Sequence, residues 1–378
     1  MATVRSARMP ARITWQQALA WRMQRHLLDP VGGSSVTRVV GRLCGVQAQV
    51  ASSAEMAVRV RRKASRRGEV GRALSEGRLI KTWAMRGALH LLTPQEAGAF
   101  LSLLGADRLW ESWRRYFGMT ANRMDALRSA ICQALEDAPQ TRVELAEKVL
   151  TRRGLRPVGE ALRSSYGELL KPLAWYGDLC FGPSGGGRVT FTRPQAASSR
   201  WTGVPDPDEA APIVIAADLS AYAPATLDAL AAWLGARVDK RRLRTLFSAL
   251  GDRLADVEVD GERAHVLAED LDELAAARPT GAVRLLPGFD QFVLGPGTAD
   301  GHVVPTPRRA AVSKRGGWIA PVVVAGGVVG GTWELDGDQV RVALFREAGT
   351  LPRASLEAEI ARISSILDRD LRSAISFA

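Results

Sequence analysis

The sequence has few of the residues that build metal centres and disulfide frameworks. Its 378 residues include only three cysteines and four histidines, and none of them form a C-x-x-C or H-E-x-x-H spacing. These absences argue against a zinc site and against structural disulfides. We therefore expect no metal, no cofactor and a reducing compartment. The scattered residues are Cys44, Cys132, Cys180, His26, His90, His265 and His302.

Long apolar stretches and nucleotide-binding glycine motifs are also missing. The longest apolar run, from Ile319 to Gly331, is 13 residues long and rich in glycine, which is too short to cross a bilayer. The first twelve residues contain no apolar segment of the kind found in secretory signals. No P-loop pattern occurs. We expect a cytoplasmic, nucleoid-associated protein with no membrane partner.

Positive charge is concentrated at one end of the chain. The net charge is +11, yet residues 1–120 hold 20 Lys and Arg against 7 Asp and Glu, while the remainder holds 31 against 33. A genome rich in G and C also favours Arg, but that bias alone would not confine the excess to one third of the chain. The asymmetry favours a polyanion-binding surface, and nucleic acid is the preferred partner.

The chain repeats one local order, helices followed by a two-stranded hairpin. Thr14 and Gln17 form a capping box that opens a helix to about Leu28, and strands are expected at 79–85 and 88–92. Helices followed by a β wing are typical of winged-helix domains. The sequence thus predicts a first winged helix over 10–118.

The same order recurs twice further along. Thr141 and Glu144 form another capping box before a second hairpin, and Asp260-Gly261 is a strong turn signal for a third one. We read 196–212 as the linker between the second and third copies. The predicted fold is α+β, mainly helical, with winged helices at 10–118, 119–207 and 212–280 and a small β-rich module at 281–378, which ends in a helix over 356–373.

The segment Gly45-Val46-Gln47-Ala48-Gln49-Val50 places two glutamines two residues apart among small apolar residues. If the chain turns there, Gln47 and Gln49 can direct two neutral amides at one point. Neutral amides can hold a water molecule or a sugar, but they are poor general bases. They also serve to cap or bridge helices. Both readings stay open from the residues alone.

Two further groups of residues are candidates for contact with DNA. Six cations crowd nine positions, where they either contact phosphates or form a solvated helix face. On the first hairpin, Trp83 belongs either to the core or to a base-stacking surface, Arg86 lies at the hairpin tip, and His90 suits either a core or a site role. The complete candidate set is Arg59, Arg61, Arg62, Lys63, Arg66, Arg67, Lys81, Trp83, Arg86 and His90.

With these motifs in place, the chain resembles the AlkZ-like family of bacterial winged-helix DNA glycosylases. The resemblance runs from about Ile13 to the C-terminus, and Ala88 stands where the family pattern has Thr. The matching blocks are Gln47-Ala48-Gln49, residues 82–90, residues 285–290, and residues 326–330 with Trp333.

The resemblance implies a function and a shape. Family members excise alkylated purines, including N7 and N3 adducts, bulky natural-product adducts and crosslinks, in base excision repair or antibiotic self-resistance. It also implies that Gln47 and Gln49 are the catalytic pair, and that three tandem winged helices form a C-shaped body around double-stranded DNA. No lysine is placed by motif for a Schiff base, so we expect a monofunctional glycosylase, acting as a monomer.

Two alternatives remain at this level. A non-catalytic winged-helix regulator would bind DNA sequence-selectively and need a two-fold dimer. A resistance protein that sequesters an alkylating natural product would protect DNA without forming abasic sites.

Overall fold

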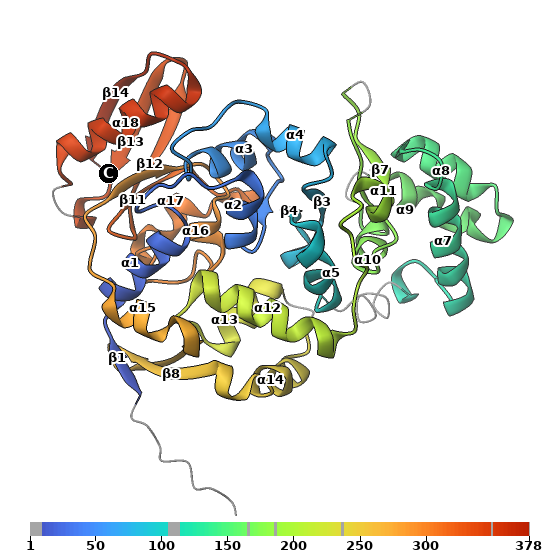
Figure 1. The fold of residues 1–378 in the computed structure, drawn as a ribbon. Coiled ribbons are helices and arrows are strands. Elements are labelled where there is room, and N and C mark those ends of the chain that lie inside the picture. Colours follow the sequence, from blue (N-terminus) through green and yellow to red (C-terminus); the bar gives the residue numbers. More distant parts are fainter. Residues whose placement is uncertain are drawn as a thin grey trace, which may run out of the picture.

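A computed structural model describes residues 10–104, 114–164, 167–184, 187–235, 238–348 and 351–377. The fold is α+β and mainly helical, as the sequence predicts. Three groups of helices, each followed by a hairpin, precede a β-rich C-terminal module (Figure 1). Parts of the boundary region predicted near residue 118 and of the second hairpin turn lie outside the described residues.

The first group begins with a short strand and ends with a helix after its hairpin. The capping box predicted at Thr14 is present, with both reciprocal hydrogen bonds to Gln17. Its elements are β1 (Ala11–Ile13), α1 (Trp15–Arg25), α2 (Val36–Arg42), β2 (Val46–Gln47), α3 (Ala51–Arg59), α4 (Glu69–Ser75), β3 (Ile80–Trp83), η1 (Met85–Gly87), β4 (Leu89–Leu92) and α5 (Pro94–Ser102).

The second group repeats this order, and its capping box at Thr141 with Glu144 is also present. Two short helices, α9 and α10, precede the hairpin of this group. Its elements are α7 (Ala121–Ala134), β5 (Gln140–Thr141), α8 (Arg142–Leu150), η2 (Arg153–Val158), α9 (Gly159–Arg163), α10 (Leu170–Trp175), β6 (Cys180–Phe181), β7 (Thr190–Thr192) and α11 (Pro194–Ala197).

The third group begins with a helix that the sequence reading missed. The predicted linker 196–212 was too long, because α12 already starts at Pro207 and contains Pro212. Asp206 with a proline at the first helical position was the available start signal. Its elements are α12 (Pro207–Tyr222), α13 (Leu227–Leu234), α14 (Lys240–Ser248), η3 (Gly251–Arg253), β8 (Leu254–Val259), β9 (Glu262–Leu267), η4 (Ala268–Asp270) and α15 (Leu271–Ala276).

Two of the sheets contain strands from distant parts of the sequence. The first two groups share one six-stranded sheet with the order β2-β4-β3-β6-β7-β5, joined where Lys81 of β3 pairs with Phe181 of β6. The hairpin of the third group pairs with a strand of the first group, since β1 runs parallel to β8. In each group a short extended segment before a helix pairs with the last hairpin strand, and the three winged helices stay a prediction.

The C-terminal module is a five-stranded sheet, in the order β10-β11-β12-β13-β14, and α18 contacts its β10 edge strand. The expected terminal helix over 356–373 ends earlier, because Asp368 adopts φ +54° and the chain then forms β14 parallel to β13. The elements are β10 (Val283–Leu286), α16 (Gln291–Leu294), η5 (Thr306–Arg308), α17 (Arg309–Val312), η6 (Arg315–Gly317), β11 (Val322–Ala325), β12 (Val328–Asp336), β13 (Gln339–Leu344), η7 (Arg346–Ala348), α18 (Arg353–Leu367) and β14 (Arg372–Phe377).

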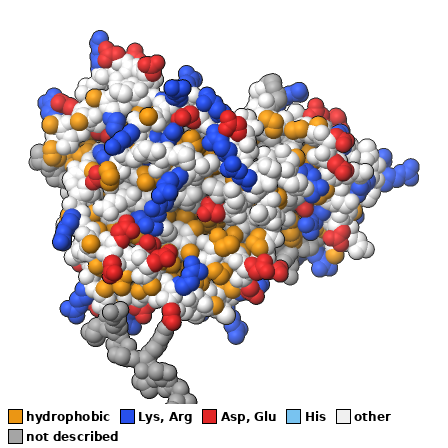
Figure 2. Space-filling model, in the orientation of Figure 1, with side chains coloured by type: hydrophobic (Ala, Val, Ile, Leu, Met, Phe, Trp, Pro, Cys, Tyr) orange, Lys and Arg blue, Asp and Glu red, His pale blue; other side chains and the backbone are white. Residues whose placement is uncertain are grey.

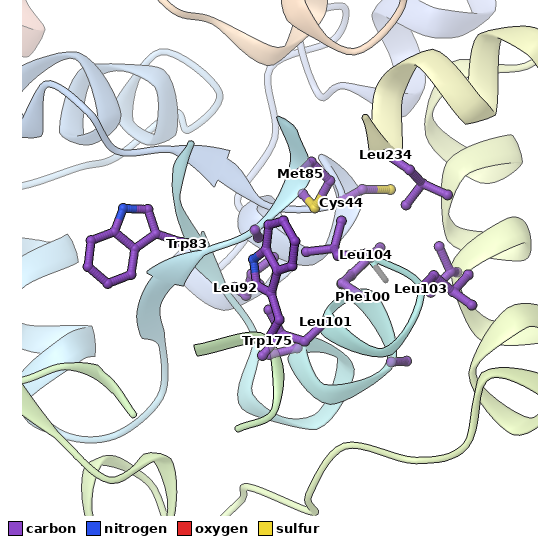
Figure 3. Packing of buried hydrophobic residues seen from close by; sticks show 14 of the residues in the cluster. Cys44, Trp83, Met85, Leu92, Phe100, Leu101, Leu103, Leu104, Trp175 and Leu234 are labelled. Carbon is purple, nitrogen blue, oxygen red and sulfur yellow. The ribbon is translucent and has the colours of Figure 1, made fainter. Parts of the chain in front are cut away.

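One large hydrophobic cluster connects the three helical groups. Figure 3 shows part of it, where Met85 and Cys44 of the first group lie near Phe100 of α5 and Leu234 approaches from α13. A second cluster joins α1 and α3 to the C-terminal module. The hairpin of the first group is therefore held from several sides. None of the helices in the described ranges combines the length and apolar character needed to cross a bilayer.

Candidate active site and DNA interface

The glutamine segment is an edge strand that leaves a tight turn. Cys44 and Gly45 both have positive φ values, +53° and +96°. A Cβ atom at Gly45 would lie 2.6 Å from a methyl carbon of Leu92, so the chain needs glycine there. β2 then pairs with β4 at the edge of the six-stranded sheet. The turn fixes the direction in which the glutamines leave the sheet.

Buried and accessible side chains alternate along this segment. Val46 and Ala48 are buried, whereas Gln47 is half-buried and Gln49 is exposed. Val50, the next residue, packs against the second hydrophobic cluster. Within the described part of the chain, no hydrogen bond to either glutamine side chain forms, so both amides are available to a ligand. This arrangement disfavours the helix-bridging reading of the pair.

His90 and Thr82 lie beside Gln47 in one row of the sheet. Gln47 pairs with His90 across β2 and β4, and His90 pairs with Thr82 across β4 and β3. Residues directly opposite in antiparallel strands share a face. Both His90 and Thr82 are fully buried, and this burial disfavours the DNA contact that was predicted for His90. Burial, with a smaller contribution from Arg86, lowers the pKa of His90 to about 3, and the ring is neutral.

Arg61 is not a phosphate-contacting residue, contrary to the prediction. Its side chain has 0% exposure and forms two hydrogen bonds to Asp290, of 2.7 and 2.8 Å. It also donates to the carbonyl oxygens of His26 and Ala57. A paired, buried guanidinium of this kind ties α3 to the N-terminus of α16 and cannot meet a phosphate without unfolding its surroundings.

The other five cations of the cluster divide into two sets. Arg59 is buried and donates to the carbonyl oxygen of Ile366, and Arg62 is half-buried and pairs with Glu69 at 2.5 Å. The remaining three are exposed and have no acidic partner within 4.0 Å among the described residues. They are Lys63, Arg66 and Arg67. Figure 2 shows Lys and Arg side chains gathered in this region, over α3 and α4.

The sequence reading missed Arg362 as a member of this basic region. It lines, with Arg62, Lys63 and Arg66, an open pocket of about 550 Å³. Arg362 belongs to α18, some 300 residues away in sequence, so only tertiary structure brings it there. Its guanidinium also holds Glu359 and the carbonyl of Val60. The only available sequence signal was the Glu-Arg pair at i, i+3 spacing on the last helix.

The hairpin residues of the first group have different environments. Trp83 is 6% exposed and packs edge-to-face on Phe181 at 4.6 Å, so it is a core residue and not a base-stacking surface. Lys81 is half-buried with its ammonium 5.6 Å from the ring centroid of Phe181, and burial lowers its pKa. Arg86 lies at the hairpin tip with φ +56° and is partly exposed, but its guanidinium donates to the carbonyl of Leu294 at 2.8 Å and burial lowers its pKa.

The described ranges contain no group of three or more His, Cys, Asp or Glu side chains arranged to hold a metal ion. The polar side chains of this row and of Gln49 are two amides, a neutral imidazole and a hydroxyl. Such groups can orient water and stabilise positive charge on a sugar, but none of them is a strong base.

Comparison with known proteins gives a consistent result. The model of the family described as "DNA glycosylase AlkZ-like" matches residues 40–366. An "Interstrand DNA cross-link repair glycosylase" of Streptomyces sahachiroi is 45% identical over 355 residues, which are 93% of this chain and 96% of that protein. The solved structure of the Streptomyces sahachiroi DNA glycosylase AlkZ is similar with a TM-score of 0.92 and 44% identity, over 96% of this chain and 100% of that chain. The chain therefore belongs to the AlkZ-like family of DNA glycosylases, enzymes of DNA repair.

Proposed function

We propose that this protein hydrolyses the N-glycosidic bond of alkylated purines in double-stranded DNA, with Gln47 and Gln49 as its catalytic residues. The observation that carries the proposal is the pair of unpartnered amides at the end of an edge strand, in the third of the chain that carries the excess of positive charge. The substrates are N7- and N3-alkylated purines, including bulky natural-product adducts. The relative from Streptomyces sahachiroi is an interstrand DNA cross-link repair glycosylase, which extends this set to interstrand crosslinks.

The chemistry suits neutral amides because the leaving group is already activated. A purine alkylated at N7 or N3 is cationic, and its glycosidic bond breaks toward an oxocarbenium-like sugar. Amide oxygens of Gln47 and Gln49 would stabilise that positive charge and orient a water molecule for attack at C1′. No strong base is needed, so the absence of a carboxylate from the Gln-x-Gln segment is no obstacle.

The enzyme is proposed to be monofunctional, with water as the nucleophile. Lys81 is the lysine nearest to this row in sequence, but it neighbours Thr82 along β3. Since successive strand residues point to opposite faces, Lys81 and Gln47 lie on different faces of the sheet. Borohydride should trap no covalent complex with DNA, and a trapped complex would contradict the hydrolytic mechanism.

Duplex binding is assigned to the exposed cations Lys63, Arg66 and Arg67, together with Arg86 at the hairpin tip. Phosphate contacts of this kind fix register and supply affinity without reading sequence. The proposed enzyme acts as a monomer, because glycosylase chemistry needs no paired half-sites.

The deciding experiment is base release from a duplex that carries one N7-alkylguanine, measured beside Gln47→Ala. Alkali-labile sites formed above the spontaneous rate and lost in the variant would support the proposal. Tight DNA binding with no release from this lesion, a bulky adduct or a crosslink would contradict it.

A further inference from the structure

The row of the sheet that holds Gln47 contains two buried polar atoms without partners. Nε2 of His90 and Oγ1 of Thr82 are shielded from solvent and make no hydrogen bond within the described residues. A buried acceptor left unpaired destabilises the folded state by an amount comparable to a full hydrogen bond. A neighbouring side chain that can rotate toward these atoms would supply the missing hydrogen bond.

The tautomer of His90 identifies Nε2 as an acceptor. Nδ1 lies 3.0 Å from the carbonyl oxygen of Ala88, and because a carbonyl only accepts, Nδ1 must carry the proton. The neutral ring then leaves a lone pair on Nε2. His90 therefore offers one unfilled acceptor toward its own row.

Gln47 is the movable donor of that row. His90 and Thr82 are fully buried on inner strands and do not bond to each other. Gln47 lies opposite His90 on the edge strand, half-buried and without a partner in the described structure, so its amide can still rotate. Opposite residues in an antiparallel pair have Cβ atoms about 5 Å apart, within reach of a glutamine side chain.

We propose that His90 is a positioning residue, whose Nε2 accepts a hydrogen bond from the amide N–H of Gln47 and thereby turns the amide oxygen of Gln47 toward the DNA. The orientation matters because an amide presents donors on one end and an acceptor on the other. An amino group directed at the sugar would repel a developing cation, whereas the oxygen stabilises it. The inference rests on the proposed function of Gln47.

Two substitutions at one position separate the two ring nitrogens. His90→Gln retains an acceptor near the place of Nε2, and His90→Asn retains a polar group near the place of Nδ1 only. We expect His90→Asn to slow single-turnover excision of N7-alkylguanine at saturating enzyme about tenfold, roughly one hydrogen bond, and His90→Gln to keep most of the rate. DNA affinity should change in neither variant, and a melting curve for each shows that it folds.

A double-mutant cycle with Gln47→Ala tests whether His90 acts through that residue. His90→Asn should cause no further loss in the Gln47→Ala background. A further tenfold loss there would overturn the proposal, and so would activity retained by His90→Asn but lost in His90→Gln, since His90 would then act through Ala88. Thr82→Val removes the competing donor and should leave the rate unchanged; a loss equal to that of His90→Asn would assign the Nε2 bond to Thr82 instead.

The cycle also separates this inference from the proposed function. If Gln47→Ala alone excises at the wild-type rate, the catalytic role of Gln47 fails whatever His90 does. If Gln47→Ala is inactive while His90→Asn is fully active, the catalytic role stands and only the positioning role of His90 fails.

Discussion

The first and second helical groups connect strand to helix in different ways. In the second group, β5 runs directly into α8, and Thr141 at its end caps α8 through a capping box with Glu144. In the first group, β2 ends at Gln47 and three more residues precede α3. The N-cap of α3 is Val50, which makes no capping hydrogen bond through its side chain.

The third group agrees with the second. Ala225 pairs with His265 of the hairpin, and Thr226 follows at once as the N-cap of α13. In the junctions of the second and third groups, the side chain of a threonine thus caps the helix N-terminus. The junction of the first group is longer and has no such cap. Local rules of helix stability are relaxed most often at functional sites. The extended junction is the one that presents Gln47 and Gln49.

The largest expected difference between the junctions concerns catalysis. Gln47→Ala and Gln49→Ala should each slow excision about a hundredfold to a thousandfold, the usual effect of removing one group that stabilises transition-state charge. The urea unfolding curve of Gln49→Ala should match wild type, because its amide has no partner in the described structure. That of Gln47→Ala should differ by no more than the one hydrogen bond proposed to His90, about 1 kcal/mol. Single-turnover base release at saturating enzyme is the measurement.

Gln140 provides the matched control, because it lies on the corresponding short strand of the second group. Its amide already donates to the carbonyl of Ala138 at 3.0 Å. Gln140→Ala should excise at the wild-type rate. Equal losses of activity in Gln47→Ala and Gln140→Ala would mean that the two junctions do not differ in function.

The buried His90 should make the first group sensitive to acid. Its folded pKa of about 3 lies below the usual value of 6.5, so the unfolded chain binds a proton more readily. The stability that depends on neutral His90 is therefore complete above pH 6.5 and is lost as pH falls toward 3. Between pH 7 and 4.5 the loss is about 3 kcal/mol, from two pKa units at 1.36 kcal/mol each.

His90→Gln isolates that contribution from other titrating groups, because glutamine does not ionise. The unfolding free energy of this variant should fall less between pH 7 and 4.5 than that of wild type. Parallel pH profiles for the two proteins would show that His90 is charged or solvated in the folded state.

The exposed cations after α3 and those after α8 should contribute differently to DNA affinity. Replacing Lys63, Arg66 and Arg67 together by alanine should lower the slope of log affinity against log salt by about 0.9 for each phosphate that is no longer neutralised. Arg153 and Arg156 follow α8 and are exposed as well, yet residues 119–207 hold 12 Lys and Arg against 9 Asp and Glu. Their replacement should leave the slope unchanged. A larger change from this second pair would place the duplex over the second group.

Local patterns predicted much of the fold. The capping boxes at Thr14 and Thr141 and the turn at Asp260-Gly261 depend on neighbouring residues only, and all three are present in the structure. The helix α12 was missed because Pro212 indicates a linker. In the structure Pro212 lies inside the helix, where a proline removes one backbone hydrogen bond and the burial of Ala211 and Val214 compensates.

The sequence patterns could not predict which of the candidate site residues are buried. Arg61 is buried by Asp290, which lies 229 positions away, and Trp83 by aromatic rings of the second hairpin. The spacing of the charges over residues 59–67 cannot reveal such distant partners. The Gln-x-Gln segment was recognisable, but only the sheet register shows that Gln47 lies opposite His90.

The smallest expected effect concerns the helix N-cap, which the junction of the first group lacks. Thr141→Ala removes the side-chain cap of α8 and should destabilise the protein by about 1 kcal/mol in urea unfolding, since both hydrogen bonds of the Thr141 hydroxyl with Glu144 are lost. Excision should stay at the wild-type rate, because the second junction only holds a helix. The opposite pattern is expected of Gln49→Ala, which should lose excision and keep its unfolding curve. If Thr141→Ala slowed excision while unfolding stayed unchanged, the contrast between a capped structural junction and an uncapped catalytic one would not hold.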